Sequence, residues 1–282
     1  MRTIVGVGSD FHGGSRFGLM NPNVVLYSED KDGNLTPWRP AMTATQAHLW
    51  KLYLSGLELM GGLAGNDRTV WIHNGDECHG NKHPQSLVST RMADQILIAD
   101  ANFRPALALP NLALARLVAG TGAHNFAEGS STMLVTKILQ GAYPGLDIQT
   151  VYHGLMDIDG FTIDYSHHGP HPGSREWLRG NVARFYLRDM MMAALMAGEK
   201  PPSLVLRGHF HSKVVETLTM GGFTSTLVII PAMCVLDDYA RQATRSVSTI
   251  TNGLFAFEVD GTRLVEIHEF TDTLDIRTKE RL

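Results

Sequence analysis

Five segments rich in Asp, His, Asn and Gly each follow a short apolar run, and this repeated order constrains the fold more than any other feature of the sequence. The apolar runs have the length of single strands, and helix-length stretches at 43–60, 87–117 and 175–196 lie between them. Strands that alternate with helices predict an α/β chain in which each strand leads into a crossover helix. The apolar runs are residues 3–8, 69–73, 117–119, 161–166 and 203–206.

The second half of the chain has a pattern that indicates antiparallel strands. An Asp-Gly pair at 159–160 predicts a turn between two strands. No linker divides the chain, so we predict one domain over residues 1–282 with two packed sheets. Prolines and an Asp-Gly pair cluster at about 20–40, which predicts an inserted long loop or irregular hairpin there. The later strand-like runs are 214–218, 223–230, 254–259 and 263–270.

The stretch 175–196 has a helical pattern of apolar residues. Five apolar side chains fall on one side of this helix, and we predict that this side faces the core. They are Leu178, Val182, Phe185, Met192 and Met196. The other long region, 87–117, must break near Pro105 or Pro110, because proline removes a helical hydrogen bond and clashes with the preceding turn.

Composition limits the functions that the chain can have. A formal net charge of −4 argues against holding nucleic acid through a broad basic surface. The chain has no apolar run of about 18 residues, and its first residues do not fit a signal peptide, so we expect a cytoplasmic protein without a membrane partner. Cys78 and Cys234 are too few for a disulfide framework, and we expect both thiols to be reduced.

Each segment rich in Asp and His offers metal donors at the end of a predicted strand. Asp10 and His12 are two residues apart, as are His209 and His211, and in an extended chain such pairs point the same way. Because the carboxyl ends of strands border the ligand crevice of an α/β sheet, five such ends predict a polydentate metal site. The segments are residues 9–13, 74–80, 122–125, 166–169 and 208–211.

The mixture of carboxylate and imidazole donors narrows the choice of metal. It suits Mn²⁺, Fe or Zn²⁺ better than Ca²⁺ or Mg²⁺, which prefer oxygen ligands. The donors exceed what one tetrahedral ion needs, so we expect two divalent ions, with Mn²⁺ first and Fe, Zn²⁺ or Ni²⁺ as alternatives. Two ions roughly 3.5–4 Å apart are typical of phosphoester hydrolysis, because together they activate water and bind the phosphoryl oxygens.

In this order the motifs resemble those of the calcineurin-like metallophosphoesterase superfamily, whose pattern is Asp-x-His, Gly-Asp, Gly-Asn-His, a strand-end His and Gly-His-x-His. The match spans residues 10–211, and its wider layout is similar to the branch found in phage and prophage genomes. The resemblance implies a two-sheet β-sandwich flanked by helices, in four layers αββα. It implies that His124 protonates the leaving oxygen. The metal ligands that it implies are Asp10, His12 and His211 for one ion, and His209 with a strand-end His for the other, with Asp76 as the bridge.

One departure from the family pattern concerns the second metal. The family's Asn before the catalytic His is replaced by Ala123, which has no ligand atom. His79, Asn81 and Asn125 are the nearby polar candidates for a ligand or a supporting role. For His79 we favour the role of a residue that orients a ligand.

Another departure is the doubled histidine His167-His168. Neighbouring residues in a strand point to opposite sides, so we expect one ligand from this pair. A His-Gly pair is common at this position in the family, which favours His168 as the ligand. His171 and Arg179 are candidates for substrate contact.

These motifs predict a metal-dependent phosphoesterase that hydrolyses a phosphomonoester or phosphodiester substrate through a two-metal centre. A DNA or RNA nuclease of the same fold is an alternative, which requires basic or aromatic side chains beside the site. A degenerate, non-catalytic binding module is a second alternative, because the family's Asn is missing. The oligomeric state is left open. The basic side chains that could contact nucleic-acid phosphates in the nuclease alternative are Arg16, Lys82, Arg91, Arg175, Arg179 and Arg241.

Overall fold

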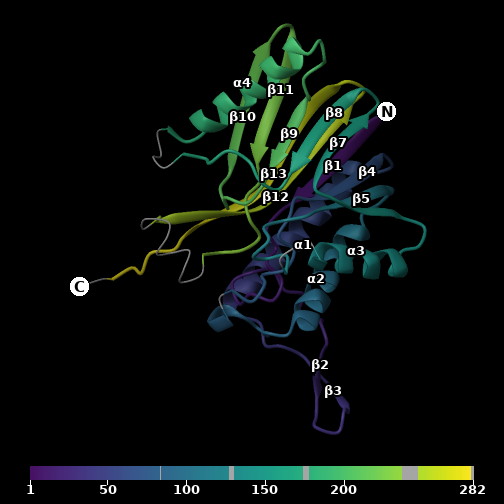
Figure 1. Cartoon of the computed structure of the whole chain (residues 1–282), viewed down its shortest axis with the longest axis vertical. Coiled ribbons are helices and arrows are strands. Elements are labelled where there is room, and N and C mark those ends of the chain that lie inside the picture. The colour runs from purple at the N-terminus through teal and green to yellow at the C-terminus, as the bar shows by residue number, and fades with distance from the viewer. Residues whose placement is uncertain (83, 127–129, 174–177, 237–246, 281–282) are drawn as a thin grey trace.

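Two β-sheets pack face to face at the centre of the molecule (Figure 1). The computed structural model describes residues 1–82, 84–126, 130–173, 178–236 and 247–280. Within these ranges the first sheet has six strands in the order β13-β12-β1-β4-β5-β6. Its strands are β1 (Arg2–Gly8), β4 (Arg68–His73), β5 (Leu112–Val118), β6 (Asp147–Val151), β12 (Thr249–Asp260) and β13 (Arg263–Asp275).

The second sheet has five strands within the same ranges, in the order β10-β11-β9-β8-β7. The turn between β7 and β8 falls at Asp159 and Gly160, which have φ angles of 53° and 89°, so the predicted turn is confirmed. Its strands are β7 (His153–Ile158), β8 (Phe161–Ser166), β9 (Leu204–Arg207), β10 (Val214–Met220) and β11 (Phe223–Ile229).

The central parallel strands β1, β4 and β9 are buried on both faces. In β1, Val5 and Val7 pack against the second sheet, whereas Ile4 belongs to the cluster under the helices. Parallel strands that are covered on both faces appear in a sequence as continuous apolar runs. The five predicted runs accordingly fall in β1, β4, β5, β8 and β9, although β5 begins at Leu112 rather than at residue 117.

Helices cover the outer faces of both sheets (Figure 1). Three of them, α1 (Ala44–Ala64), α2 (Met92–Leu107) and α3 (Ser130–Ala142), pack against the first sheet, and α4 (Asn181–Met196) packs against the second. The start of α1 is fixed by Thr43, whose side chain accepts a hydrogen bond from the Gln46 N–H. This arrangement confirms the predicted two-sheet sandwich flanked by helices.

The buried side of α4 is not the side that the sequence predicted. The helix begins at Asn181 rather than at residue 175, and residues 174–177 lie outside the described ranges. Its buried side chains are Ala183, Leu187 and Met191, whereas all five apolar side chains predicted to face the core are exposed. Both sets repeat at helical spacing, and the packing of the helix on β10 and β11 decides which set is buried.

The predicted break of the long region 87–117 near Pro105 or Pro110 is confirmed. Residues 87–117 contain α2 and most of β5, and α2 ends at Leu107, two residues after Pro105. The segment at 20–40 contains an antiparallel hairpin of β2 (Leu26–Glu29) and β3 (Leu35–Trp38), which projects at the lower end of the molecule in Figure 1. A short 3₁₀ turn, η1, spans Pro84–Ser86.

The described helices include none that is both long and apolar enough to cross a membrane. Both cysteines are buried free thiols.

Candidate metal centre

The loops that follow five strands meet at one end of the sandwich. β1, β4 and β5 are parallel neighbours in the first sheet, and β8 and β9 are parallel neighbours in the second. Backbone hydrogen bonds join the loops, since Asp10 N–H donates to the Gly75 carbonyl and Gly208 N–H donates to the His167 carbonyl, both at 2.9 Å. The carboxyl ends of these strands thus deliver polar side chains to one place.

One group of donors consists of Asp10, His12 and His211, whose ligand atoms all lie within 4.8 Å of one another. The Nε2 atoms of His12 and His211 are 3.1 Å apart, and Asp10 Oδ1 lies 3.3 Å from His211 Nε2. Ligand atoms that share a cation at about 2.0–2.2 Å are separated by roughly 2.8–3.5 Å. The spacing of this group therefore fits one metal ion.

A second group consists of Asp76, His167 and His209, again within 4.8 Å. His167 Nδ1 lies 2.7 Å from the Asn74 carbonyl oxygen, so this nitrogen carries a hydrogen and donates it. In the neutral ring, Nε2 then presents a lone pair to Asp76 Oδ2 at 3.1 Å. Such an arrangement requires a proton or a cation between the two atoms.

The two groups lie side by side. The backbone N–H of His209, in the second group, donates to Asp10 Oδ2 of the first group at 3.2 Å. Asp10 and Asp76 are almost fully buried, so their carboxylates are held away from bulk water. Each group therefore combines one buried carboxylate with two imidazoles.

The backbone of the donor residues differs from the extended conformation that the sequence suggested. Asp10, His12, Asp76, His209 and His211 all have positive φ angles, between 46° and 72°. The His209 and His211 side chains belong to different groups, so the pair does not aim at one point. Non-glycine residues with positive φ cost of order 1–3 kcal/mol each and concentrate at functional sites. The donors are thus positioned by tight turns rather than by strand alternation.

Two glycines permit the close approach of the loops. A Cβ atom at Gly120 would lie 2.0 Å from Asp76 Oδ1, and one at Gly208 would lie 2.3 Å from the Ser9 hydroxyl oxygen. Ser9 in turn donates a very short hydrogen bond to Asp10 Oδ2. The absence of a side chain at these positions is therefore required for both carboxylates to sit where they do.

Of the doubled histidines, the structure brings His167 and not His168 into a donor group. His167 is 1% exposed and contacts Asp76, whereas His168 is exposed and stacks at the edge of His209, with ring centroids 4.5 Å apart. The sequence favoured His168 because a His-Gly pair is common in the family. The end of β8 turns the preceding residue inward instead, so the geometry favours His167.

His12 also links the first group to His79 and His124. The Nδ1 atoms of His12 and His79 lie 3.2 Å apart, on the side of the His12 ring opposite His211. His124 Nδ1 donates to the His79 carbonyl oxygen at 2.5 Å, and the His124 ring centroid is 4.6 Å from that of His12. These contacts suit His79 to orient His12, and they hold His124 beside the first group.

The two asparagine candidates are engaged elsewhere. Asn81 donates to the Thr90 carbonyl and accepts from Gln95 Nε2, both at 2.9 Å. Asn125 Oδ1 accepts from the Thr132 N–H at 3.2 Å and from the Thr132 hydroxyl at 2.9 Å, at the start of α3. These hydrogen bonds occupy the side-chain oxygens of both asparagines.

Of the candidate substrate contacts, His171 packs against the loop that carries His209 and His211. His171 is exposed, and its ring centroid lies 5.1 Å from that of Phe210, between His209 and His211. Arg179 is exposed in the turn before α4. Arg16 Nε donates to the Leu87 carbonyl at 3.1 Å, and Lys82 is exposed. Arg91 Nη1 donates to the Tyr27 carbonyl oxygen. Arg175 and Arg241 lie outside the described residues.

The electrostatics of the site favour ionised carboxylates. Burial alone would raise the pKa of Asp10, but the positive charges of His211 and His167 hold it below its ordinary value. Burial likewise lowers the pKa of His167, yet the carboxylates of Asp76 and Asp10 outweigh it and raise that pKa to about 9. Burial and the charge of His167 lower the pKa of His209 to about 4. The second group thus attracts one positive charge, which a bound cation would supply.

Buried polar atoms without partners support the same conclusion. Asp10 Oδ1 is buried and has no hydrogen-bond donor, although it faces the two rings of its group. A buried carboxylate oxygen without a donor is costly unless a cation lies near it. The donor set of carboxylate and imidazole fits Mn²⁺, Fe or Zn²⁺. The residues present therefore fit divalent metal ions.

The sequence motifs missed Thr121, which lies between β5 and His124. Its hydroxyl oxygen is 3.1 Å from His209 Nδ1 and 3.3 Å from His167 Nε2, and its N–H donates to Asp76 Oδ1 at 2.6 Å. A lone threonine after a strand has no distinctive sequence signal. The sequence offered one sign of its role: Thr121 lies two residues before Ala123, where the chain departs from the family pattern.

Aromatic packing beneath the site anchors the first loop. Phe11, between Asp10 and His12, is fully buried, and its ring centroid lies 4.3 Å from that of His73. His73 also packs edge-on against Phe103 at 4.8 Å. Burial lowers the pKa of His73 to about 3, because a charged imidazole is unfavourable there.

We expect the variant His73→Leu to resist acid better than the wild type. The folded protein keeps His73 neutral down to about pH 3, whereas the unfolded chain binds a proton below about pH 6.5, so wild-type stability falls through that window. The free energy of unfolding of the variant minus that of the wild type should rise by about 2 kcal/mol from pH 7.5 to pH 5. Chemical denaturation in EDTA at both pH values measures this difference. The same difference at both pH values would contradict the assignment.

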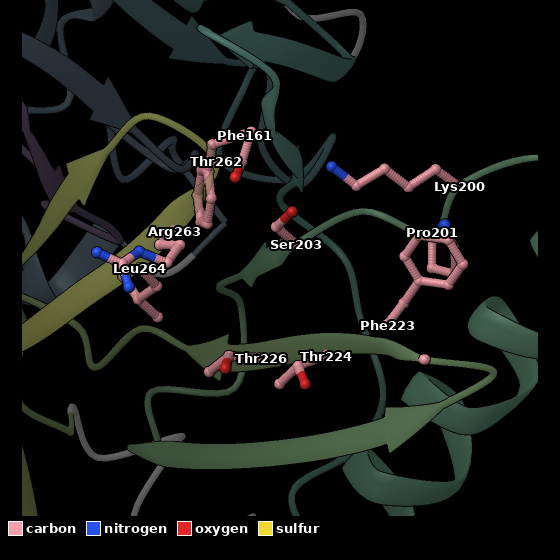
Figure 2. Close-up of a pocket in the computed structure, with 11 residues that line it drawn as sticks. Phe161, Lys200, Pro201, Ser203, Phe223, Thr224, Thr226, Thr262, Arg263 and Leu264 are labelled. Carbon is pink, nitrogen blue, oxygen red and sulfur yellow. The ribbon is translucent and has the colours of Figure 1, made fainter. Parts of the chain in front are cut away.

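A cavity of about 430 Å³ lies at the other end of the second sheet (Figure 2). It is lined by Phe161 at the start of β8, by Ser203 just before β9 and by the turn that joins β12 and β13. Lys200 and Arg263 extend from separate segments of its lining, and Lys200 Nζ donates to the Gly160 carbonyl at 2.9 Å. None of the described donor residues lines this cavity.

Comparison with known proteins adds little to this geometry. No protein-family model matches the chain, and no curated protein matches its sequence. Solved structures do match it, among them the sulfate thiohydrolase SoxB of Thermus thermophilus in complex with glycerol, at 10% identity and a TM-score of 0.40. The match covers 97% of this chain and 56% of that one, so this chain spans little more than half the length of SoxB.

Proposed function

We propose that this chain is a metal-dependent phosphoesterase of the calcineurin-like kind, which binds two divalent cations, with Mn²⁺ as the expected metal. The observation that carries the proposal is the pair of adjacent donor groups, each with a buried carboxylate and two imidazoles, at the ends of four strands. Two neighbouring cations supply the activation of water and the neutralisation of phosphoryl oxygens. A metal site with a purely structural role needs only one ion, whose coordination is completed by protein ligands.

In this proposal Asp10, His12 and His211 hold one cation. Asp76, His167 and His209 hold the other. The hydrogen bond from His209 N–H to Asp10 Oδ2 fixes the two groups relative to each other. Burial of both carboxylates excludes competing water from the donor oxygens and strengthens their attraction for cations.

His124 is the proposed proton donor to the leaving oxygen. Its Nδ1 is committed to the His79 carbonyl, so Nε2 is the nitrogen left to face a substrate. The ring is partly buried and packs edge-on against His12. A substrate bound at the first group would therefore lie within reach of this nitrogen.

The variant His124→Asn tests this role. We expect kcat to fall by about 10²–10⁴-fold, the usual contribution of a positioned acid, while the metal content stays as in the wild type. His48→Asn is a matched control, because His48 lies on α1, outside both donor groups, and pairs with Asp272. Activity of His124→Asn equal to the wild type would rule out the assignment.

The first experiment joins metal content to turnover. Protein purified without chelator is analysed for metals, and the same sample is assayed with added Mn²⁺ on bis-p-nitrophenyl phosphate and p-nitrophenyl phosphate. We expect close to two metals per chain and hydrolysis of at least one of the two esters, which also identifies a diesterase or a monoesterase. One metal or none, without turnover in excess Mn²⁺, would favour the non-catalytic binding module instead.

A nuclease of the same fold is tested with the same samples. Digestion of single-stranded DNA or RNA that depends on added Mn²⁺, together with salt-sensitive retardation of the nucleic acid in a gel, would identify that alternative. The acidic net charge of −4 makes a small phosphoester the expected substrate class.

A further inference from the structure

We propose that the hydroxyl oxygen of Thr121 is a ligand of the second metal and takes the place of the side chain that Ala123 lacks. This inference rests on the proposed two-metal function, and it deepens the description of the same site. Among the described His, Cys, Asp and Glu residues, the second group offers Asp76, His167 and His209, so a further protein donor would fill a coordination position that water otherwise takes.

The distances of Thr121 Oγ1 match those between ligands of one cation. It lies 3.1 Å from His209 Nδ1 and 3.3 Å from His167 Nε2. Ligand atoms that share a cation lie roughly 2.8–3.5 Å apart. A hydroxyl can donate to one ring nitrogen and accept from the other, and a cation among the three atoms would instead use the lone pair of each of them.

Backbone contacts hold the hydroxyl in this position. The Thr121 N–H donates to Asp76 Oδ1 at 2.6 Å, so Thr121 contacts all three members of the second group. Gly120 has no side chain, which lets the loop pass against Asp76. The His124 N–H donates to the Thr121 carbonyl at 2.9 Å, so one turn places Thr121 in the second group and His124 beside the first.

A threonine hydroxyl has suitable chemistry for this role. The Ser or Thr hydroxyl of phosphate-binding loops binds Mg²⁺ in the same manner. It is a neutral oxygen donor and supplies no negative charge to the cation. The second site should therefore bind its ion more weakly than a site completed by a further carboxylate.

Calorimetric titration of the metal-free full chain with Mn²⁺ tests the proposal. We expect two ions for the wild type, and for Thr121→Val one ion with unchanged affinity and a second weakened by about 10–100-fold. Thr121→Ser keeps the oxygen and should bind as the wild type does. Thr136→Val is the control, since the Thr136 hydroxyl bonds Thr150 between α3 and β6.

Thr121→Cys distinguishes a ligand from a residue that only orients the histidine rings. With Co²⁺, a thiolate ligand produces a sulfur-to-metal charge-transfer absorption, which we expect in this variant and not in the wild type. Two ions bound by Thr121→Val as tightly as by the wild type, or no such band in Thr121→Cys carrying two Co²⁺ ions, would overturn the inference. Fewer than two ions in the wild type would instead overturn the proposed two-metal function.

Discussion

His167→Ala is expected to lose one of the two cations and at least about 100-fold in kcat/KM on the better phosphoester, whereas His168→Ala should keep both cations. His167 is buried, and its Nε2 lies 3.1 Å from Asp76 Oδ2. His168 contacts the second group through the packing of its ring against those of His167 and His209. Its removal should change kcat/KM by less than about tenfold, the lower end of the effect of supporting residues.

Metal analysis and steady-state kinetics of the two variants measure this contrast. His167→Gln serves as a second variant, because it keeps a polar side chain if the alanine variant does not fold. A reversed pattern, in which His168→Ala loses a metal and His167→Ala does not, would show that His168 is the ligand, as the His-Gly motif favoured. Circular dichroism melting of each apo variant separates loss of metal from loss of fold.

Arg207→Met is expected to lower the free energy of unfolding by about 3 kcal/mol. Arg207 is the last residue of β9, immediately before the Gly-His-x-His loop, and it is fully buried. Its Nη2 lies 2.6 Å from Asp164 Oδ1 and 3.1 Å from the Tyr186 hydroxyl. Removal of the guanidinium leaves the Asp164 carboxylate, which is only 12% exposed, without its closest cation.

Denaturant unfolding of apo protein measures this effect. Arg184→Met is the matched control, because Arg184 is exposed in its pair with Glu216 and such pairs contribute about 1 kcal/mol or less. The double variant Arg207→Met/Asp164→Leu should recover part of the loss, since it leaves no unpaired charge. A loss for Arg207→Met no larger than that for Arg184→Met would show that the buried pair is not a principal support of the second sheet.

Arg207 also illustrates what a local pattern cannot indicate. Arginine is seldom buried, so the place of Arg207 after an apolar run gives no local sign that its side chain lies in the interior. The buried position exists because Asp164 on β8 and Tyr186 on α4 converge on it. A Cβ atom at Gly169 would lie 2.6 Å from the Arg207 side chain, so that glycine also makes room for it.

The fold class followed from the sequence because burial on both faces leaves a local trace. Parallel strands such as β1 and β4 are continuous apolar runs, and the Asp-Gly pair at 159–160 requires the positive φ that the turn shows. The donor segments were recognisable for the same reason. A carboxylate and a histidine directly after a buried strand must lie at the end of a sheet.

Which side chains meet was decided only by the tertiary structure. The choice of His167 over His168 and the buried side of α4 each depend on a partner distant in sequence. The positive φ angles of Asp10 and His209 likewise persist only because neighbouring loops hold them. The sequence by itself determined which strand ends carry metal donors, because the periodicity of apolar residues and the residue types are local properties of the chain. The packing of two sheets determined which donors share a site, because contacts between distant segments have no local signal.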